Sequence, residues 1–269
     1  MNNLHRKLAP VSEAAWAQIE DEASRTLKRH LAARRVVDVT GPKGFDLSAA
    51  GTGHIRAIDA PGDDGIQASI REVNPIVELR IPFELSRQAI DDVERGSRDS
   101  DWQPLKDAAR KIAFAEDRAV FEGYAAAGIQ GIRQGSSNTV LTLPPSIKNY
   151  SDTVAHALSE LRLAGVNGPY ALVLGADAYT AASGGSDEGY PVLNHIRDLV
   201  DGEIVWAPAI QGGFVFSVRG GDFELTIGQD ISIGYLSHTD TTVKLYLQES
   251  FTFRFYTSEA VVCLDAAKK

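Results

Sequence analysis

The feature that most limits the fold is an alternating run near the C-terminus, VKLYLQESFTFRFYT, residues 243–257. One face of an extended chain would carry Val243, Leu245, Leu247, Phe251, Phe253 and Phe255. The other face would carry Lys244, Tyr246, Gln248, Ser250, Thr252 and Arg254. This period of two predicts a β-strand with one apolar face. At about 3.3 Å per residue, the run would span roughly 50 Å.

A second constraint is a long hairpin that has little apolar surface of its own. The strand-like runs HIRAID and IQASIREV, between residues 54 and 73, are joined by the turn-forming residues APGDDG. A two-stranded hairpin with few large apolar side chains cannot bury enough of itself to be stable. We therefore expect it to lie against another surface. The next run, PIVELRIPFEL, alternates cleanly and predicts a half-buried strand.

Three helices are predicted outside the middle of the chain, and one of them is a short helix that ends at Glu94–Gly96. After the N-cap candidate Ser12, apolar residues recur at helical spacing and predict a helix that ends near Arg35. A longer helix is expected over residues 101–126, where it would span about 40 Å. Residues 135–221 mix short helices with short strands, which predicts a small inserted α/β unit.

Composition and motif searches indicate a protein without an active site of its own. The net charge of −9 argues against nucleic acid as a partner, because a binder needs a basic face. No metal-binding histidine spacing and no GxSxG nucleophile motif occurs, so we expect no catalytic residues, no metal and no cofactor. The lone Cys263 is interpreted as a buried apolar residue. No apolar run is long enough for a membrane span and no signal segment is visible, so a cytoplasmic protein is expected.

An ordered set of short motifs extends over essentially the whole chain. The most specific motif is GGDF.L..GQD.SIGY, at Gly220–Tyr235. The others are LAP at Leu8–Pro10 with Trp16 and Ile19, VDV.GP at Val37–Pro42, ERG at Glu94–Gly96, GPY.LV at Gly168–Val173, and E.FTF at Glu249–Phe253. In this order, the motifs resemble those of the encapsulins, bacterial shell proteins with the fold of tailed-phage major capsids.

The resemblance implies an α+β fold and a closed icosahedral shell of roughly 60 identical copies. It implies a peripheral domain (residues 1–47, 85–134 and 222–269), an extended E-loop (48–84) and an axial domain (135–221). The hairpin would be the E-loop and would lie on a neighbouring subunit. A phage capsid protein would usually need an internal scaffold, and none is expected here because the first helix begins near Ser12. A bacteriocin or protease, labels that members of the family have carried, is the remaining alternative.

The resemblance also implies a site for the C-terminal targeting peptide of a cargo enzyme, such as a dye-decolourising peroxidase or a ferritin-like protein. The role would then be in oxidative stress or iron storage. The site would lie between the N-terminal helix and the SIGY strand, with Asp38 and Asp230 pairing to donors on the peptide. From the residues alone, ordinary core positions would be the simpler interpretation. The implied residues are Leu31, Arg34, Val36, Asp38, Asp230, Ile231, Ile233, Gly234 and Tyr235.

Two further features have an interpretation within the family. The segment SGGSDEG is expected to be a flexible loop; at a five-fold pore, Asp187 and Glu188 from five copies would form an acidic ring that favours cations. Its residues are Ser183, Gly184, Gly185, Ser186, Asp187, Glu188 and Gly189. Some encapsulins bind flavin through a tryptophan on the helix before ERG, but here that position is Gln88, so no flavin is predicted.

Overall fold

The long strand lies at the centre of a five-stranded sheet. The structure, a computed structural model, describes residues 3–62, 65–187 and 189–266. Strand β13, Thr242–Phe255, pairs with β4 (Val77–Ser86) along one side and with β12 (Ser232–His238) and β11 (Phe223–Ile227) along the other. A short strand, β1 (Asp38–Thr40), extends this sheet beyond β11 in parallel. The alternating run is therefore a strand, as predicted.

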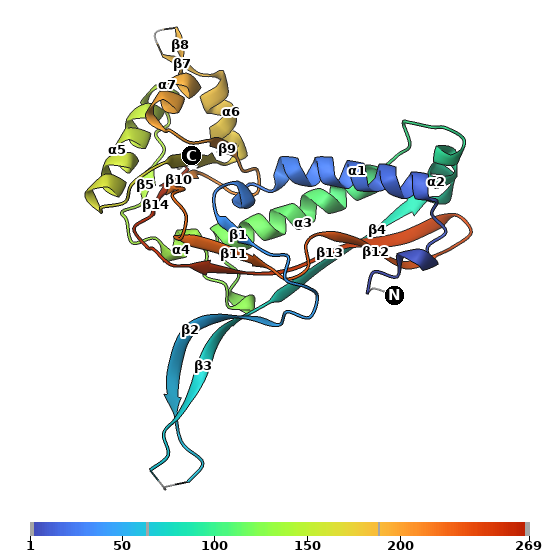
Figure 1. Ribbon diagram of the computed structural model, residues 1–269. Coiled ribbons are helices and arrows are strands. Elements are labelled where there is room, and N and C mark those ends of the chain that lie inside the picture. Colours follow the sequence, from blue (N-terminus) through green and yellow to red (C-terminus); the bar gives the residue numbers. More distant parts are fainter. Residues whose placement is uncertain (1–2, 63–64, 188, 267–269) are drawn as a thin grey trace.

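Three helices cover one face of this sheet (Figure 1). Helix α1, Glu13–His30, begins at Ser12, whose hydroxyl accepts a hydrogen bond from the amide nitrogen of Ala15 at 3.2 Å. Helices α2, Arg87–Glu94, and α3, Gln103–Phe121, pack with α1 over β4, β12 and β13. The apolar core between them includes Ile19, Leu105, Leu245 and Leu247.

Helix α3 is shorter than the sequence indicated. It ends at Phe121 rather than near residue 126, and Tyr124, inside the predicted range, is exposed. The chain turns at Gly123, which has a φ of 88°. Gly131 packs so closely there that a Cβ on it would lie 2.1 Å from the Gly123 nitrogen. This contact stops the helix.

A second sheet and three helices form the other large unit, at the upper left of Figure 1. The strand order is β5-β14-β10-β6-β9, and buried Cys263 lies in β14. The strands are β5 (Leu141–Thr142), β6 (Tyr170–Leu174), β9 (Ile204–Trp206), β10 (Gly213–Ser217) and β14 (Val261–Asp265). The helices are α5 (Tyr150–Leu163), α6 (Ala176–Gly184) and α7 (Val192–Leu199).

Short elements connect these layers. The helices are η1 (Arg6–Leu8), η2 (Ala33–Arg35), η3 (Ala125–Ala127), α4 (Ile132–Gly135) and η4 (Ile147–Asn149). Strand β14 pairs within the second sheet and strand β4 within the first.

The sequence also predicted the residue boundaries of a peripheral domain, an E-loop and an axial domain. These boundaries remain a prediction.

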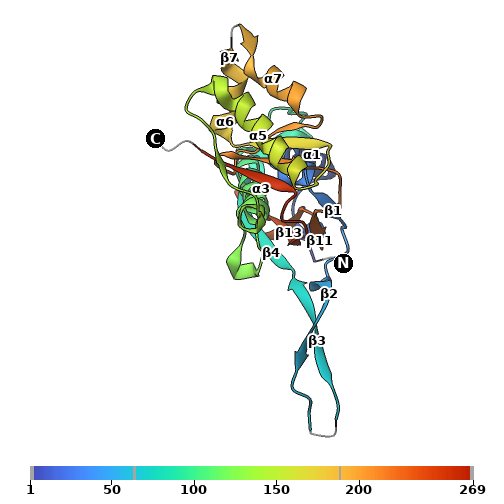
Figure 2. The same ribbon diagram turned by 90° about the vertical axis from the view of Figure 1, so that its left-hand side faces the viewer.

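The hairpin projects far from both sheets (Figures 1 and 2). It consists of β2, Ala49–Ile58, and β3, Ala68–Pro75, in antiparallel pairing. Its aliphatic side chains are open to solvent, and Ile55 is 68% exposed. Such a row of exposed apolar side chains is typical of a surface that another protein covers.

Candidate functional site

A groove of about 430 Å³ runs between α1 and the start of β12. The apolar stripe of α1 forms one side, because residues three and four positions apart share a helix face. Residues 230–233, at the start of β12, form the other side together with Leu247 of β13. The lining residues are Leu4, Arg6, Glu20, Ala23, Ser24, Leu27, Lys28, Leu31, Arg34, Asp230, Ile231, Ser232, Ile233 and Leu247.

Five of the nine predicted site residues meet in this groove. They are Leu31, Arg34, Asp230, Ile231 and Ile233. They come from two segments about 200 residues apart in the sequence, which the sheet and α1 bring together. Leu27, also in the groove, belongs to the apolar stripe of the helix. Leu4 carries no such pattern, because it precedes the helix.

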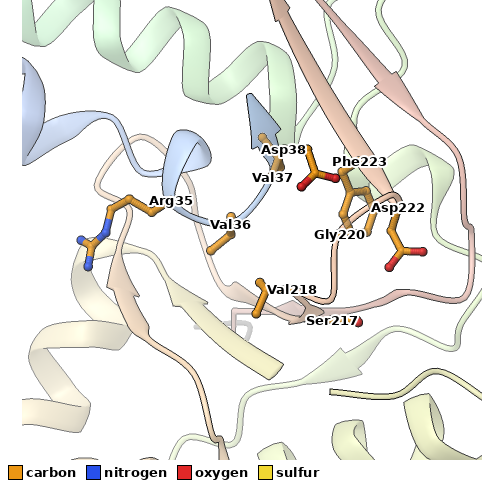
Figure 3. Close-up of a pocket in the computed structure, with 9 residues that line it drawn as sticks. All are labelled: Arg35, Val36, Val37, Asp38, Ser217, Val218, Gly220, Asp222 and Phe223. Carbon is orange, nitrogen blue, oxygen red and sulfur yellow. The ribbon is translucent and has the colours of Figure 1, made fainter. Parts of the chain in front are cut away.

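Val36 and Asp38 lie elsewhere, beside a smaller pocket of about 120 Å³ (Figure 3). Val36 is buried, and the exposed Asp38 accepts a hydrogen bond from the Gly221 nitrogen at 2.5 Å. Gly220 and Gly221 both have positive φ values, 85° and 82°, and Asp38 stabilises this turn. In Figure 3 the side chain of Arg35 is directed away from Asp38.

Gly234 and Tyr235 hold the strand rather than line the groove. A Cβ on Gly234 would lie 2.1 Å from the ring of Tyr246, so only glycine fits there. The Tyr235 nitrogen donates to the Leu4 carbonyl oxygen at 2.9 Å. The Tyr235 hydroxyl is 2.6 Å from Nδ1 of His238.

Arg34 connects the groove to a buried cluster of carboxyl groups. Its guanidinium donates to Glu116 Oε2 at 2.5 Å and to Asp230 Oδ1 at 2.7 Å, and lies 3.4 Å from Glu249 Oε2. The side chains of Glu116 and Glu249 are 0% exposed, whereas Asp230 is 54% exposed. Burial opposes the charge on Arg34, but the bonds and charges of Glu116 and Asp230 outweigh it and raise the pKa of Arg34.

The pKa values of two carboxyl groups in this cluster are raised. Burial, together with the negative charge of Glu116, raises the pKa of Glu249 well above its usual range. Burial also raises the pKa of Asp117 to about 7, although the nitrogens of Ala32 and Ala33 donate to it at 3.1 and 2.9 Å. The neutral forms of Glu249 and Asp117 are therefore favoured in the folded chain.

The predicted pore segment is a small hairpin rather than a loop. Ser183 and Gly184 belong to the last turn of α6, and Gly185 follows it. Ser186–Asp187 (β7) pairs with Tyr190–Pro191 (β8), at the upper tip in Figure 1. Gly189 has a φ of 87° in the turn, and Glu188 lies outside the described residues. The ring of Tyr190 packs on His195 of α7, with centroids 4.6 Å apart.

Two other kinds of site are absent from the part of the chain that the structure describes. Among the residues that the structure describes, no three His, Cys, Asp or Glu side chains are grouped so that they could hold a metal ion. None of the helices in the described ranges combines the length and the apolar character needed to cross a membrane.

Comparison with known proteins shows what the sequence is similar to. Residues 1–252 match the family described as "Encapsulating protein for peroxidase". The type 1 encapsulin shell protein of Rhodococcus erythropolis is 62% identical over 98% of this chain and 100% of its own length. Its counterpart from Mycobacterium tuberculosis is 59% identical, over the same shares of the two chains.

Solved structures share the fold at low sequence identity. A virus-like particle from Pyrococcus furiosus matches with a TM-score of 0.66 and 16% identity, over 92% of this chain and 98% of its own. The capsid of a native GTA particle matches with a TM-score of 0.52 and 14% identity, over 90% and 91%. The predicted α+β fold of phage capsid proteins is thus confirmed.

Proposed function

The chain belongs to the encapsulin family of shell proteins, and from this premise we propose that it captures a cargo enzyme through that enzyme's C-terminal peptide. The predicted resemblance is confirmed, and the family and the capsid fold make the chain a self-assembling shell component. The proposal adds a closed icosahedral shell of roughly 60 copies. A dye-decolourising peroxidase or a ferritin-like protein is the proposed cargo, and the family's description supports the peroxidase. The shell itself is proposed to have no catalytic role, in keeping with relatives named shell proteins.

The observation that carries the proposal is the groove between α1 and β12. The half-buried side chains of Leu31 and Ile231 form an apolar surface there that a short peptide could cover, and buried Ile233 lies beneath it. Each apolar peptide side chain that is fully buried would contribute about 1.5–3 kcal/mol. An oligomeric cargo with one peptide per subunit would bind several shell subunits at once, so a weak single contact is sufficient.

The projecting hairpin supports the shell. Exposed Ile55, Ile58, Ile70 and Val73 give β2 and β3 an apolar surface without a partner in the same described chain. We propose that a neighbouring copy covers it. The tip formed by β7 and β8 is proposed to rim the five-fold pore, where the carboxylates of Asp187 and Glu188 would favour cations.

The size of the purified particle tests whether the chain assembles into a closed shell. We expect gel filtration and negative-stain microscopy to show uniform hollow spheres of megadalton mass. A monomer or small oligomer would refute the shell. Packaged DNA inside the particles would indicate a phage-type capsid instead, and proteolysis by cargo-free particles would indicate a protease.

A substitution in the groove tests capture. Ile231→Asp is expected to leave assembly intact and to lower cargo loading more than tenfold, because a carboxylate would replace an apolar contact. Leu236→Asp is the matched control: it lies in β12, the strand that Ile231 directly precedes, is exposed and does not line the groove. Loading is measured as the mass ratio of co-purified protein to shell. An unchanged ratio for Ile231→Asp would remove the groove as the cargo site.

A further inference from the structure

The segment before α1 lies along β12 and is fixed at both ends. At its start, the Tyr246 hydroxyl donates to the Asn3 carbonyl oxygen at 3.2 Å, and the Asn3 amide donates to Gln229 at 3.2 Å. Next, the Leu4 carbonyl accepts from the Tyr235 nitrogen at 2.9 Å. These contacts hold residues 3 and 4 against β12 and β13.

The same segment is also attached to α1. Arg6, in the short helix η1, forms an ion pair with Glu20 at 2.5 Å. Its guanidinium lies over the Trp16 ring, 4.1 Å from the centroid. Ion pairs with this much exposure are weak alone, but the stacked ring adds to this one. Residues 3–8 thus bridge the helix and the strand that form the two sides of the groove (Figure 1).

Leu4 and Leu8 differ in burial and in their position relative to the groove. Leu4 is 9% exposed and lines the groove, whereas Leu8 is 59% exposed and does not. Leu4 nevertheless takes part in neither of the two large apolar cores of the described chain. Its burial therefore serves the rim of the groove rather than the interior of a sheet.

We infer that residues 3–8 form a third wall of the groove and that Leu4 contacts the cargo peptide. This inference rests on the proposed function and adds a specificity-determining residue to it. A peptide held between α1 and β12 meets Leu31 and Ile231 on two sides, and Leu4 closes the third with another apolar side chain. The Tyr235 nitrogen is already bonded to Leu4, so it is not available to an added strand at that position.

The alternative is that residues 3–8 occupy the place of the peptide and compete with it. The groove argues against this, because about 430 Å³ remains open beside Leu4 and Arg6. If the segment competed with the peptide, loosening it would raise cargo loading, whereas loss of a third wall would lower it. One experiment on loading therefore distinguishes competition from the third wall.

The probe is a monomeric fluorescent protein that ends in the last twenty residues of the protein that co-purifies with the shells. One peptide per reporter avoids multivalent binding. It is co-expressed with the full chain below saturation, and the reporter-to-shell ratio is measured by fluorescence. Leu4→Ser is expected to lower the ratio about tenfold, and Leu8→Ser to leave it unchanged. Ile231→Asp serves as the reference variant, in which the groove is expected not to bind the peptide.

Loss of loading in Ile231→Asp with normal loading in Leu4→Ser would overturn the inference and leave the proposed function standing. Higher loading in Leu4→Ser would also overturn it, in favour of competition. Normal loading in Ile231→Asp would overturn both. If Leu4→Ser does not assemble, Tyr246→Phe is used, because it removes only the hydroxyl that holds Asn3. A reduced ratio is expected there too, and an unchanged ratio would count against the third wall.

Discussion

Replacing Arg34 by methionine is expected to destabilise the subunit strongly. Arg34 is the cation that contacts both Glu116 and Glu249, whose side chains are 0% exposed. Without it, the Glu116 carboxylate stays buried with no cation at hydrogen-bond distance. Breaking a buried pair by removing one partner costs about 3–5 kcal/mol. For a chain of this size, that corresponds to a fall in melting temperature of roughly 6–20 °C.

The assay is thermal unfolding of purified shells, followed by tryptophan fluorescence at one protein concentration. Arg35→Met is the matched control, since Arg35 pairs with Glu203 at 2.7 Å in an exposed position. Exposed pairs contribute at most about 1 kcal/mol, so the control should melt within about 4 °C of the parent. The double variant Arg34→Met/Glu116→Gln should recover most of the loss, because it removes the unpaired charge as well. Equal melting of Arg34→Met and Arg35→Met, or no recovery in the double variant, would refute the reasoning.

Two further predictions concern pH and the small pocket. The folded pKa of Glu249 lies above its ordinary value of 4.5, so the folded chain holds the extra proton and loses stability as pH rises from about 4.5 towards the folded pKa. The melting temperature of Glu249→Gln should therefore rise relative to that of the parent as pH increases above about 4.5, and parallel curves of melting temperature against pH would contradict this. Asp38→Ala should cost about 1 kcal/mol through loss of the bond to Gly221 and should keep reporter loading within about twofold of the parent. Lost loading in intact shells would return Asp38 to the cargo site.

Local pattern was sufficient for the main elements of the fold. Alternation over residues 243–257 predicted β13, and the Ser12 cap with its helical stripe predicted α1. The end of α3 was beyond such reasoning, because it depends on Gly131, eight residues after Gly123, packing against that turn. The β7–β8 hairpin was missed for a similar reason: two pairs of residues give no alternation to detect.

The predicted site residues do not all line one groove, and the reason is a local turn of the chain. The family resemblance implied that Val36 and Asp38 share a site with Leu31 and Arg34. The turn of η2, Ala33–Arg35, redirects the chain, so these two residues face a different pocket. The burial of Leu4 beside the groove was not predicted, because a short segment before a helix has no period from which its buried side could be identified.

The charged groups around Arg34 indicate which contacts would recognise a peptide in the groove. Asp230 was expected to pair with a donor on the peptide, yet its Oδ1 atom already accepts from Arg34 at 2.7 Å and from the Ile231 nitrogen at 2.8 Å. Arg34 in turn is held by buried Glu116, so taking Asp230 from it would disturb the cluster that supports the groove. Arg6 is likewise paired with Glu20. Recognition of the proposed peptide should therefore depend mainly on the apolar side chains of Leu31, Ile231 and Leu4, while the ion pairs hold in place the segments that carry them.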